Sequence, residues 1–254
     1  MSTTTVTGAP GASGAALKID ARSEMLRITD LHAFYDESHI LHGIDLTVRE
    51  GELVTLLGRN GAGRSTTLKA VMGLVGRRSG QVMFNGHDIS ALAPHRIAQL
   101  GVGFCPEERG IFSGLTTEEN LMLPPRFHGG GMTLDEIYGV FPNLYERRGS
   151  PGTRLSGGEQ QMLAMARILR TGARLLLLDE ITEGLAPVIV KKLGEVIRLL
   201  KGRGYTIVLV EQNFRFAAPL ADRHYVLEHG RIVATVQQHE LADKTPMLHE
   251  LLGV

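Results

Sequence analysis

The fold is decided by the stretch GRNGAGRST, residues Gly58–Thr66, whose glycines have the spacing of a phosphate-binding loop. The pattern for such a loop is G-x-x-x-x-G-K-[ST], and Arg64 stands where the pattern has lysine. An apolar run over 53–57 predicts a strand before the loop, and Ser65 opens a predicted helix after it. Backbone N–H groups and the positive end of that helix then face a β/γ-phosphate pair. A tight strand-to-helix turn without a ligand is the alternative interpretation.

Bulk composition limits the classes of protein that this chain can represent. Its 254 residues are 43% hydrophobic and 21% charged, which suits one large core with or without an inserted lobe. Basic and acidic residues number 27 each, so there is no broad basic footprint and we expect no nucleic-acid partner. The single cysteine, Cys105, fits a reducing compartment. No apolar run has the length of a membrane span, so we expect any membrane role to come through a partner.

The organisation of the chain changes after its first residues. Residues 1–24 are rich in Ser, Thr, Gly and Ala, and we expect a disordered leader there and one domain over 25–254. Between 107 and about 170 the strand signal fades, which predicts a helical lobe inserted into an α/β core. The apolar patterns predict strands at 26–28, 44–48, 53–57, 175–178 and 206–210, and an amphipathic helix over 188–200.

Two carboxylates, Asp179 and Glu180, follow the buried run 175–178 directly. They leave the carboxyl end of a predicted strand, where ligands of open α/β sheets collect. Successive strand residues point to opposite sides, so Asp179 can face Mg²⁺ while Glu180 orients or deprotonates the attacking water. Ser65 would place its hydroxyl on the same ion. An ordinary acidic loop is the alternative, which the upstream phosphate loop disfavours.

A second predicted helix start carries the sequence LSGGEQ, with Ser156 ahead of two glycines. A hydroxyl and bare amides at a helix N-terminus form a further anion-binding end. Alone, such a start is an ordinary helix cap. One chain with two phosphate-facing helix ends and a strand-end Asp-Glu pair is much rarer.

The motifs GRNGAGRST, LSGGEQQ and LLLLDE, in that order and with a helical lobe between the first two, resemble the nucleotide-binding subunit of ATP-binding cassette (ABC) transporters. The resemblance covers 25–254. It implies a P-loop NTPase fold with a RecA-like parallel sheet, an N-terminal antiparallel β subdomain and the inserted helical lobe. It also implies ATP and Mg²⁺ as cofactors and a sister ATPase subunit packed head to tail, whose LSGGE helix closes over the γ-phosphate.

Shorter matches are similar to the ATPase subunit of the Liv-type importer of branched-chain amino acids. They lie at Pro106-Glu107, Ile111-Phe112, 115–121, 182–187 (TEGLAP) and 210–213 (VEQN). This resemblance implies permease partners, an external solute-binding protein, and a peripheral location at the cytoplasmic face of the inner membrane. Importers of urea and amides share much of the pattern and stay an alternative.

The resemblance assigns site residues one by one. It implies catalytic roles for Arg64, Glu180 and Gln212, and metal ligation by Ser65, Glu107 and Asp179. The implied nucleotide-binding residues are Tyr35, Gly58, Arg59, Asn60, Gly61, Ala62, Gly63, Arg64, Ser65, Thr66, Ser156, Gly157, Gly158 and Glu159. Tyr35 would stack on adenine; a strand tyrosine that packs on its sheet is the alternative.

The chain departs from the family pattern at several positions around the nucleotide. Besides Arg64, Glu107 stands where a glutamine is frequent, Gln212 where many relatives have histidine, and Ile181 where proline is usual. If the guanidinium sits ~4 Å rather than ~3 Å from the phosphate charge, the Coulomb attraction weakens by roughly 1.4 kcal/mol at an effective dielectric of ~20. That corresponds to about tenfold in rate.

Two hypotheses for the activity follow from these departures. In the first, the chain binds MgATP and hydrolyses it slowly. In the second, it is a regulatory half that binds ATP and leaves turnover to its sister subunit. A third class, the cassette ATPases of DNA repair or translation, usually carries coiled-coil or zinc insertions or two cassettes, and this sequence contains neither pattern.

Overall fold

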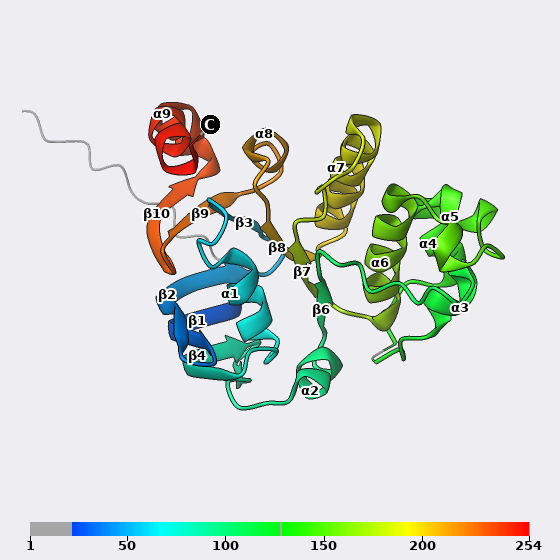
Figure 1. Ribbon diagram of the computed structural model, residues 1–254, viewed down its shortest axis with the longest axis horizontal. Coiled ribbons are helices and arrows are strands. Elements are labelled where there is room, and N and C mark those ends of the chain that lie inside the picture. Colours follow the sequence, from blue (N-terminus) through cyan, green and yellow to red (C-terminus); the bar gives the residue numbers. More distant parts are fainter. Residues whose placement is uncertain (1–21, 128, 254) are drawn as a thin grey trace, which may run out of the picture.

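The computed structural model describes residues 22–127 and 129–253 (Figure 1). The predicted leader lies outside these residues except for its last three, and Glu24 already belongs to the first strand. The strands are β1 (Glu24–Tyr35), β2 (Ser38–Arg49), β3 (Leu53–Gly58), β4 (Arg77–Phe84), β5 (His87–Asp88), β6 (Val102–Cys105), β7 (Leu175–Asp179), β8 (Thr206–Val210), β9 (Arg223–Glu228) and β10 (Arg231–Gln237). The helices are α1 (Arg64–Val71), α2 (Pro94–Gln99), α3 (Thr117–Met122), α4 (Leu134–Val140), α5 (Pro142–Glu146), η1 (Gly152–Arg154), α6 (Gly157–Thr171), α7 (Pro187–Gly202), α8 (Phe214–Ala217), η2 (Gln238–Glu240) and α9 (Leu241–Leu252).

A six-stranded sheet with the order β10-β9-β3-β8-β7-β6 forms the centre of the molecule. Its strands are parallel from β9 to β6, and β10 joins the edge antiparallel. Parallel strands need crossover helices on both faces, so their side chains are buried on both sides. Strand β7 shows this, because Leu175 and Leu177 enter one hydrophobic cluster while Leu176 and Leu178 enter the other.

A second sheet, with the order β2-β1-β4-β5, is antiparallel and covers one face of the central sheet together with α1 and α2. The two long strands β1 and β2 pair along most of their length, from Glu24 opposite Arg49 to Tyr35 opposite Ser38. Tyr35 therefore ends β1 at the side of α1, where the chain turns back. The predicted parallel core with an antiparallel N-terminal subdomain is confirmed by these two sheets.

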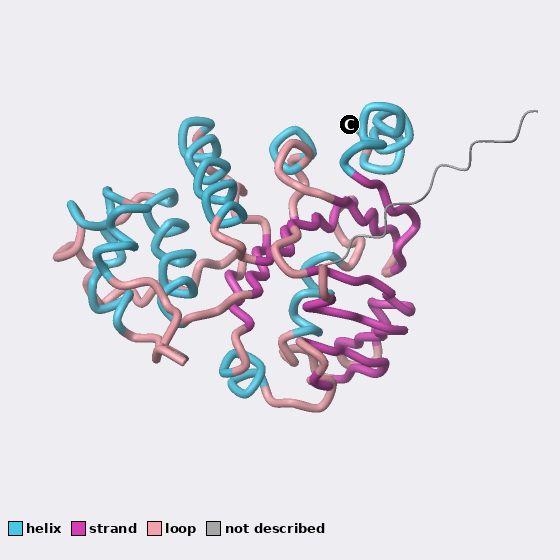
Figure 2. The backbone as a smooth tube through the Cα atoms, turned by 180° about the vertical axis from the view of Figure 1, so that it is seen from behind, coloured by secondary structure: helices cyan, strands magenta, loops and turns pink. Residues whose placement is uncertain are grey.

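Helices α3, α4, α5 and α6 form a separate group beside the central sheet, at the right of Figure 1 and at the left of the opposite view in Figure 2. Between β6 and β7, the described residues contain these helices, η1 and one isolated bridge between Thr116 and Pro151. Capping boxes at Thr116 and Thr133 start α3 and α4, because each threonine exchanges hydrogen bonds with a glutamate three residues on. The helices lie inside the range over which the sequence predicts the lobe.

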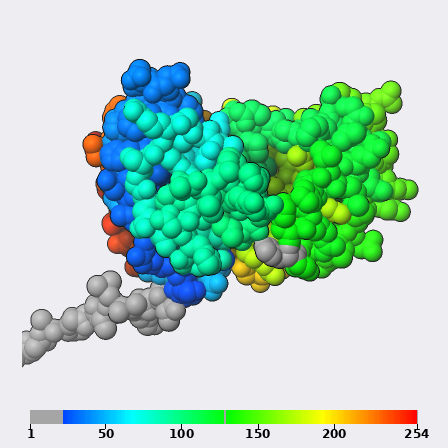
Figure 3. All heavy atoms as spheres, turned by 90° about the horizontal axis from the view of Figure 1, so that it is seen from below, coloured from blue at the N-terminus to red at the C-terminus, as the bar shows by residue number. Residues whose placement is uncertain are grey.

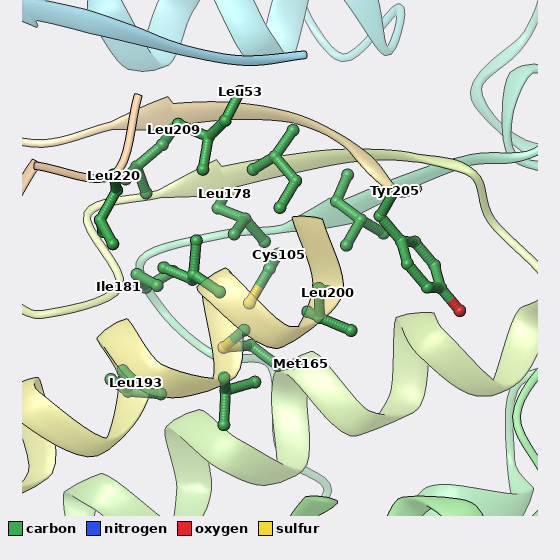
Figure 4. Close-up of a cluster of buried hydrophobic side chains, with 14 of the residues drawn as sticks. Leu53, Cys105, Met165, Leu178, Ile181, Leu193, Leu200, Tyr205, Leu209 and Leu220 are labelled. Carbon is green, nitrogen blue, oxygen red and sulfur yellow. The ribbon is translucent and has the colours of Figure 1, made fainter. Parts of the chain in front are cut away.

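The core on the other face of the sheet joins the strands to α6 and α7 (Figure 4). Leu178 and Leu209 from the strands meet Leu193 and Leu200 of α7, and Met165 of α6 lies at the same cluster. Each of these side chains is almost fully buried. This packing fixes the carboxyl ends of β7 and β8 relative to each other, which is where the predicted acidic residues lie.

Candidate nucleotide-binding site

Two glycines of the stretch GRNGAGRST stand where no larger residue fits. Gly58, at the end of β3, has φ +154°, and a Cβ on it would lie 2.4 Å from the carbonyl oxygen of Leu227. Gly63 has φ +102° and is the N-cap of α1, and a Cβ on it would lie 2.7 Å from Cδ2 of Leu41. Since only glycine adopts this backbone without strain, the loop turns tightly and its amides are left at the N-terminus of α1.

A cavity of about 510 Å³ lies over this loop. It joins residues from distant parts of the sequence, because β1, β3, β7 and β8 all end near the start of α1. The residues that line it are Tyr35, Ile40, Asn60, Gly61, Ala62, Gly63, Arg64, Ser65, Thr66, Glu107, Glu180, Glu183 and Gln212. Among the described residues, the lining does not include Gly58, Arg59, Asp179 or the predicted set Ser156–Glu159.

The side chain of Arg64 turns toward the acidic end of β7. Its Nη2 lies 2.7 Å from Oε1 of Glu180, and only 4% of the arginine side chain is exposed. The same Nη2 donates to Oδ1 of Asn60 at 3.2 Å, and Nη1 donates to the carbonyl oxygen of Glu211 at 3.1 Å. Burial lowers the pKa of Arg64 from its usual value, and the attraction of Glu180 opposes that change. The guanidinium is thus held by three partners inside the cavity wall.

Glu180 is held at both carboxylate oxygens. Arg64 occupies Oε1, and Nε2 of Gln212 donates to Oε2 at 2.9 Å. The backbone of Glu180 has φ +45°, a left-handed conformation that is uncommon for a residue with a side chain. Its amide donates to the carbonyl of Val210 at 3.0 Å, so the turn after β7 is fastened to the end of β8. Glu180 thus combines a strained backbone conformation with a carboxylate that is hydrogen-bonded at both oxygens.

Two of the three predicted metal ligands are in direct contact, and the third lines the same cavity as Ser65. Its Oγ donates to Oδ1 of Asp179 at 2.8 Å, and the exposed Glu107 lines the same cavity. Burial raises the pKa of Asp179 to about 6, against the hydrogen bond from Ser65, so a cation here would favour the ionised carboxylate.

This donor set fits Mg²⁺ that arrives with phosphate groups. No group of three or more His, Cys, Asp or Glu within the part of the chain that the structure describes could hold a metal by itself. A hydroxyl and one or two carboxylates are hard oxygen donors, and Mg²⁺ in nucleotide sites uses such a small protein set together with the substrate's phosphates.

The LSGGEQ segment begins α6 in the helical group. Ser156 is the N-cap, and it forms a capping box in which its Oγ accepts from the Glu159 amide at 3.3 Å and its amide donates to Glu159 at 2.7 Å. Arg147 adds a contact to the same carboxylate at 3.3 Å. The segment is well ordered as a helix start and stands apart from the cavity of its own chain.

Sequence reasoning missed three residues of this site. Ile40 and Glu183 line the cavity, and Glu211 lies directly behind it. Glu183 and Glu211 both fall in motifs that resemble the family, TEGLAP and VEQN, but the motifs alone do not indicate what either side chain contacts. The continuous apolar run of β8 could have indicated that Glu211 is buried, because the strand directly before it is buried on both faces.

Glu211 is a buried acid, with 2% of the residue exposed. Its Oε2 accepts from the hydroxyl of Thr182 at 2.8 Å and its Oε1 from the Thr182 amide at 3.2 Å. Burial raises the pKa of Glu211 to about 7, and the two bonds from Thr182 oppose that rise. Glu180 stands nearby as a like charge and raises the pKa further.

The chain is similar to known proteins along most of its length. Residues 41–183 match the family model described as ABC transporter. The high-affinity branched-chain amino acid transport ATP-binding protein BraG of Pseudomonas aeruginosa is 42% identical over 217 residues, which cover 82% of this chain and 91% of that protein. The probable branched-chain amino acid transport ATP-binding protein LivF of Archaeoglobus fulgidus is 39% identical over 238 residues, with coverages of 91% and 99%. The lipopolysaccharide export system ATP-binding protein LptB of Haemophilus influenzae is 33% identical over 237 residues, with coverages of 90% and 97%.

Solved structures show the same fold. A nucleotide-free ATP-binding cassette from an ABC transporter has a TM-score of 0.78 at 21% identity, covering 91% of this chain and 99% of that one. The dimeric post-hydrolysis state of the ATP-binding cassette MJ0796, bound to ADP and Pi, has a TM-score of 0.73 at 22% identity, with coverages of 84% and 99%. These likenesses confirm the predicted P-loop NTPase fold.

The buried carboxyl of Glu211 makes a testable contribution to the pH dependence of stability. Its pKa in the folded chain is raised from 4.5 to about 7, so folding binds a proton between these values. The contribution of Glu211 to the free energy of unfolding is therefore largest below the lower value and falls by up to about 3 kcal/mol as pH rises through the higher one. Glu211→Gln removes this loss, and we expect the wild type to lose stability relative to this variant between pH 5 and 8, measured by urea unfolding.

The exposed Glu195 on α7 provides the matched control. Glu195→Gln should follow the wild type at every pH, because its side chain keeps its water on folding. If the free energy of unfolding of the wild type and of Glu211→Gln changes with pH in parallel, the assignment of a raised pKa to Glu211 is contradicted.

Proposed function

The chain belongs to the ABC transporter family, and we propose that within it this subunit binds and hydrolyses ATP to energise an importer of branched-chain amino acids. The family match and the named relatives confirm the predicted resemblance, and membership makes the chain a transport ATPase. The observation that carries the proposed mechanism is the meeting of the phosphate loop, Glu180 and Gln212 around one cavity.

Each wall of the cavity suits one part of MgATP. Tyr35 is 40% exposed at the end of β1 and offers a ring face for adenine. The amides of Asn60–Thr66 at the N-terminus of α1 suit the β- and γ-phosphates. Ser65 and Asp179, with Glu107 across the cavity, would hold Mg²⁺, which supplies neutralisation of the phosphate charge.

Glu180 is the group that we assign to the attacking water. It lies at the carboxyl edge of β7 beside the cavity, and an ionised carboxylate there can orient the water or accept its proton. Gln212 contacts the same carboxylate and lines the cavity, so its amide can donate a hydrogen bond to the γ-phosphate. Unlike a histidine, glutamine brings no positive charge to that contact.

The contact between Arg64 and Glu180 supports a reduced rate of ATP hydrolysis and not its complete loss. The guanidinium of Arg64 is paired with Glu180, so the carboxylate that should act on water is already engaged. A γ-phosphate offers the guanidinium a stronger anion, and the transfer of Arg64 to it would release Glu180. The cost of breaking the pair is added to the barrier, which supports a reduced turnover.

Closure of the site would use a second subunit. Ser156, Gly157, Gly158 and Glu159 begin a helix that stands apart from the cavity of their own chain, so they are free to meet the phosphates held by another. A related cassette of the same fold is described as a dimer bound to ADP and Pi. Both observations support a head-to-tail pair with a sister ATPase.

The names of the relatives support branched-chain amino acids as the transported solute. BraG and LivF, whose names give branched-chain amino acid transport, are 42% and 39% identical to this chain. LptB, whose name gives lipopolysaccharide export, is 33% identical, and urea or amide import also stays an alternative. The larger identities favour a branched-chain amino-acid importer, which works with two permeases and an external solute-binding protein.

A second candidate is a regulatory subunit that binds ATP without appreciable turnover. The specific observation that favours it is again the Arg64–Glu180 ion pair, together with Gln212 in place of histidine. In that case the sister subunit alone hydrolyses ATP, and this chain contributes its nucleotide-dependent closure.

A groove between the sheet and the helical group supports the permease as a further partner. A cavity of about 400 Å³ has Met72, Leu74 and Phe104 on one side and Phe127 and Ile168 on the other. Figure 3 shows a recess at this boundary, between the surface of residues near 100 and the helical group. Its apolar walls suit a permease segment with apolar side chains, which would hold this chain at the cytoplasmic face of the inner membrane.

None of the helices over 22–127 and 129–253 is both long and apolar enough to span a membrane.

Glu180→Gln tests the proposed hydrolysis. It keeps the shape of the side chain but removes the carboxylate, so we expect ATP turnover of the purified chain to fall at least about 100-fold while MgATP still binds. Turnover is measured by phosphate release and binding by calorimetry, and Glu195→Gln, at an exposed position of α7, should behave as the wild type. A transporter assembled with its natural partners that keeps full activity with Glu180→Gln would favour the regulatory candidate instead.

Arg64→Lys tests the cost of the ion pair. The compact ammonium follows the family pattern and reaches Glu180 less well, so we expect turnover to rise about tenfold without loss of MgATP affinity. Arg96→Lys changes an exposed arginine of α2 and should leave both quantities unchanged. A turnover of Arg64→Lys at or below that of the wild type would show that the guanidinium does not hold hydrolysis back.

Leu74→Asp tests the groove as the permease contact. Leu74 is 48% exposed at its wall, so a charge there should disrupt an apolar contact without disturbing the fold. We expect the variant to bind MgATP normally but to co-purify poorly with the natural permeases. Leu199→Asp, at a residue 43% exposed on α7 and outside the groove, is the control. Equal recovery of permease with both variants would place the contact elsewhere.

A further inference from the structure

Three consecutive residues at the end of β8 hold the turn that carries Glu180. The carbonyl of Val210 accepts from the Glu180 amide at 3.0 Å. The carboxylate of Glu211 accepts two bonds from Thr182, and the amide of Gln212 donates to Glu180. Of these three contacts, only the one made by Glu211 reaches past Glu180 to the far side of the turn.

The turn itself is short and leaves Glu180 little freedom. Glu180 has φ +45°, and its carbonyl accepts from the Glu183 amide at 3.2 Å. Ile181 is fully buried in the core cluster that Figure 4 draws, so the residue after Glu180 points away from the cavity. Thr182 then returns to Glu211. The direction of the Glu180 side chain is therefore fixed by an apolar anchor at Ile181 and a polar anchor at Thr182.

Loss of the hydrogen bonds between Thr182 and Glu211 would cost free energy. Glu211 is 2% exposed and Thr182 is 8% exposed, so neither can exchange its partner for water. A buried donor or acceptor left without a partner carries its full desolvation penalty, and the turn would shift to avoid it. Any shift at Thr182 is passed to Glu180 two residues earlier, because the backbone between them is anchored at Ile181.

We propose that Glu211 is a positioning residue for the hydrolysis reaction, which aims the Glu180 carboxylate by fixing Thr182, and which acts without contact to nucleotide or metal. This proposal rests on the proposed role of Glu180. Glu211 and Thr182 both lie behind the described lining of the nucleotide cavity, so their side chains act through the turn. Small displacements of a reacting group have large effects on rate, whereas they leave the phosphate loop and its binding of nucleotide intact.

Glu211 also links the turn to Arg64. Nη1 of Arg64 donates to the carbonyl oxygen of Glu211 at 3.1 Å while Nη2 contacts Glu180. When the guanidinium moves, both the backbone of Glu211 and the carboxylate of Glu180 lose a partner. The two hydrogen bonds that Thr182 donates to the Glu211 carboxylate keep the turn in place when Arg64 changes partners.

The test compares four variants of the full chain assembled with its natural membrane partners. Glu211→Ala and Thr182→Val each remove the polar anchor, and we expect each to lower kcat about tenfold or more, with MgATP affinity by calorimetry within about twofold of wild type. Glu211→Gln can accept from the Thr182 amide and donate to its hydroxyl, so it should keep kcat within about threefold. Thr182→Ser keeps the hydroxyl and should do the same.

A double-mutant cycle separates positioning from general loss of stability. If the two residues act through one contact, Glu211→Ala combined with Thr182→Val should lower kcat no further than Glu211→Ala alone. Turnover is expressed per mole of bound MgATP, so that unfolded protein does not contribute. Wild-type kcat in Glu211→Ala, fully additive losses, or a Glu211→Gln variant as slow as Glu211→Ala would each overturn the proposal.

Failure of the proposal can be told from failure of the proposed function. If Glu180→Gln keeps its turnover, Glu180 is not the group that acts on water, and the proposed mechanism itself falls. If Glu180→Gln is inactive while Glu211→Ala is as fast as wild type, only the positioning role of Glu211 is wrong.

Discussion

The ion pair between Arg64 and Glu180 is the constraint around which the nucleotide site is organised. Its two charged groups are 4% and 10% exposed, so each has lost most of its water and depends on the other. Two unit charges 4 Å apart attract by about 4 kcal/mol at an effective dielectric of ~20, and this attraction offsets the cost of removing both groups from water. Removing one partner leaves a buried charge, and the surrounding amide groups of Asn60 and Gln212 cannot neutralise it.

The central sheet makes this pair possible by bringing three strand ends together. β3 leads into the phosphate loop, β7 ends at Asp179, and β8 ends just before Glu211, and these strands are neighbours in the order β3-β8-β7. Parallel strands place all their carboxyl ends at one edge, where α1 begins. Burial on both faces fixes the strands, so the side chains that leave their ends have little freedom. The polar side chains of the site are therefore held in place by the buried strands that carry them.

Much of this arrangement could be predicted from the sequence, since local patterns determine it. The apolar runs over 53–57, 175–178 and 206–210 are strands, and the glycine spacing implied the loop before α1. The hydrogen bond between Ser65 and Asp179 joins the start of α1, which follows β3, to the end of β7, and both residues stand where the two motifs place polar side chains at one edge of the sheet. What could not be predicted depends on the direction of side chains that meet from separate parts of the sequence. Arg64 turns toward Glu180 because a guanidinium is long enough to reach it. Glu211 is paired with Thr182 because both are buried just beyond the carboxyl ends of β8 and β7.

The arginine that stands in place of the pattern's lysine changes how the strand ends are joined to the phosphate loop. A lysine has one ammonium, which can serve either a phosphate or a carboxylate but is not shaped to span both. The fork of Arg64 contacts Glu180 through Nη2 and the Glu211 carbonyl through Nη1, so one side chain fastens the ends of β7 and β8 to the phosphate loop. A phosphate that draws the guanidinium away must therefore compete with both strand ends at once. On the proposed function, the carboxylate that acts on water becomes free only when the nucleotide supplies the replacement anion, so the same interaction that slows hydrolysis also makes it conditional on a bound triphosphate.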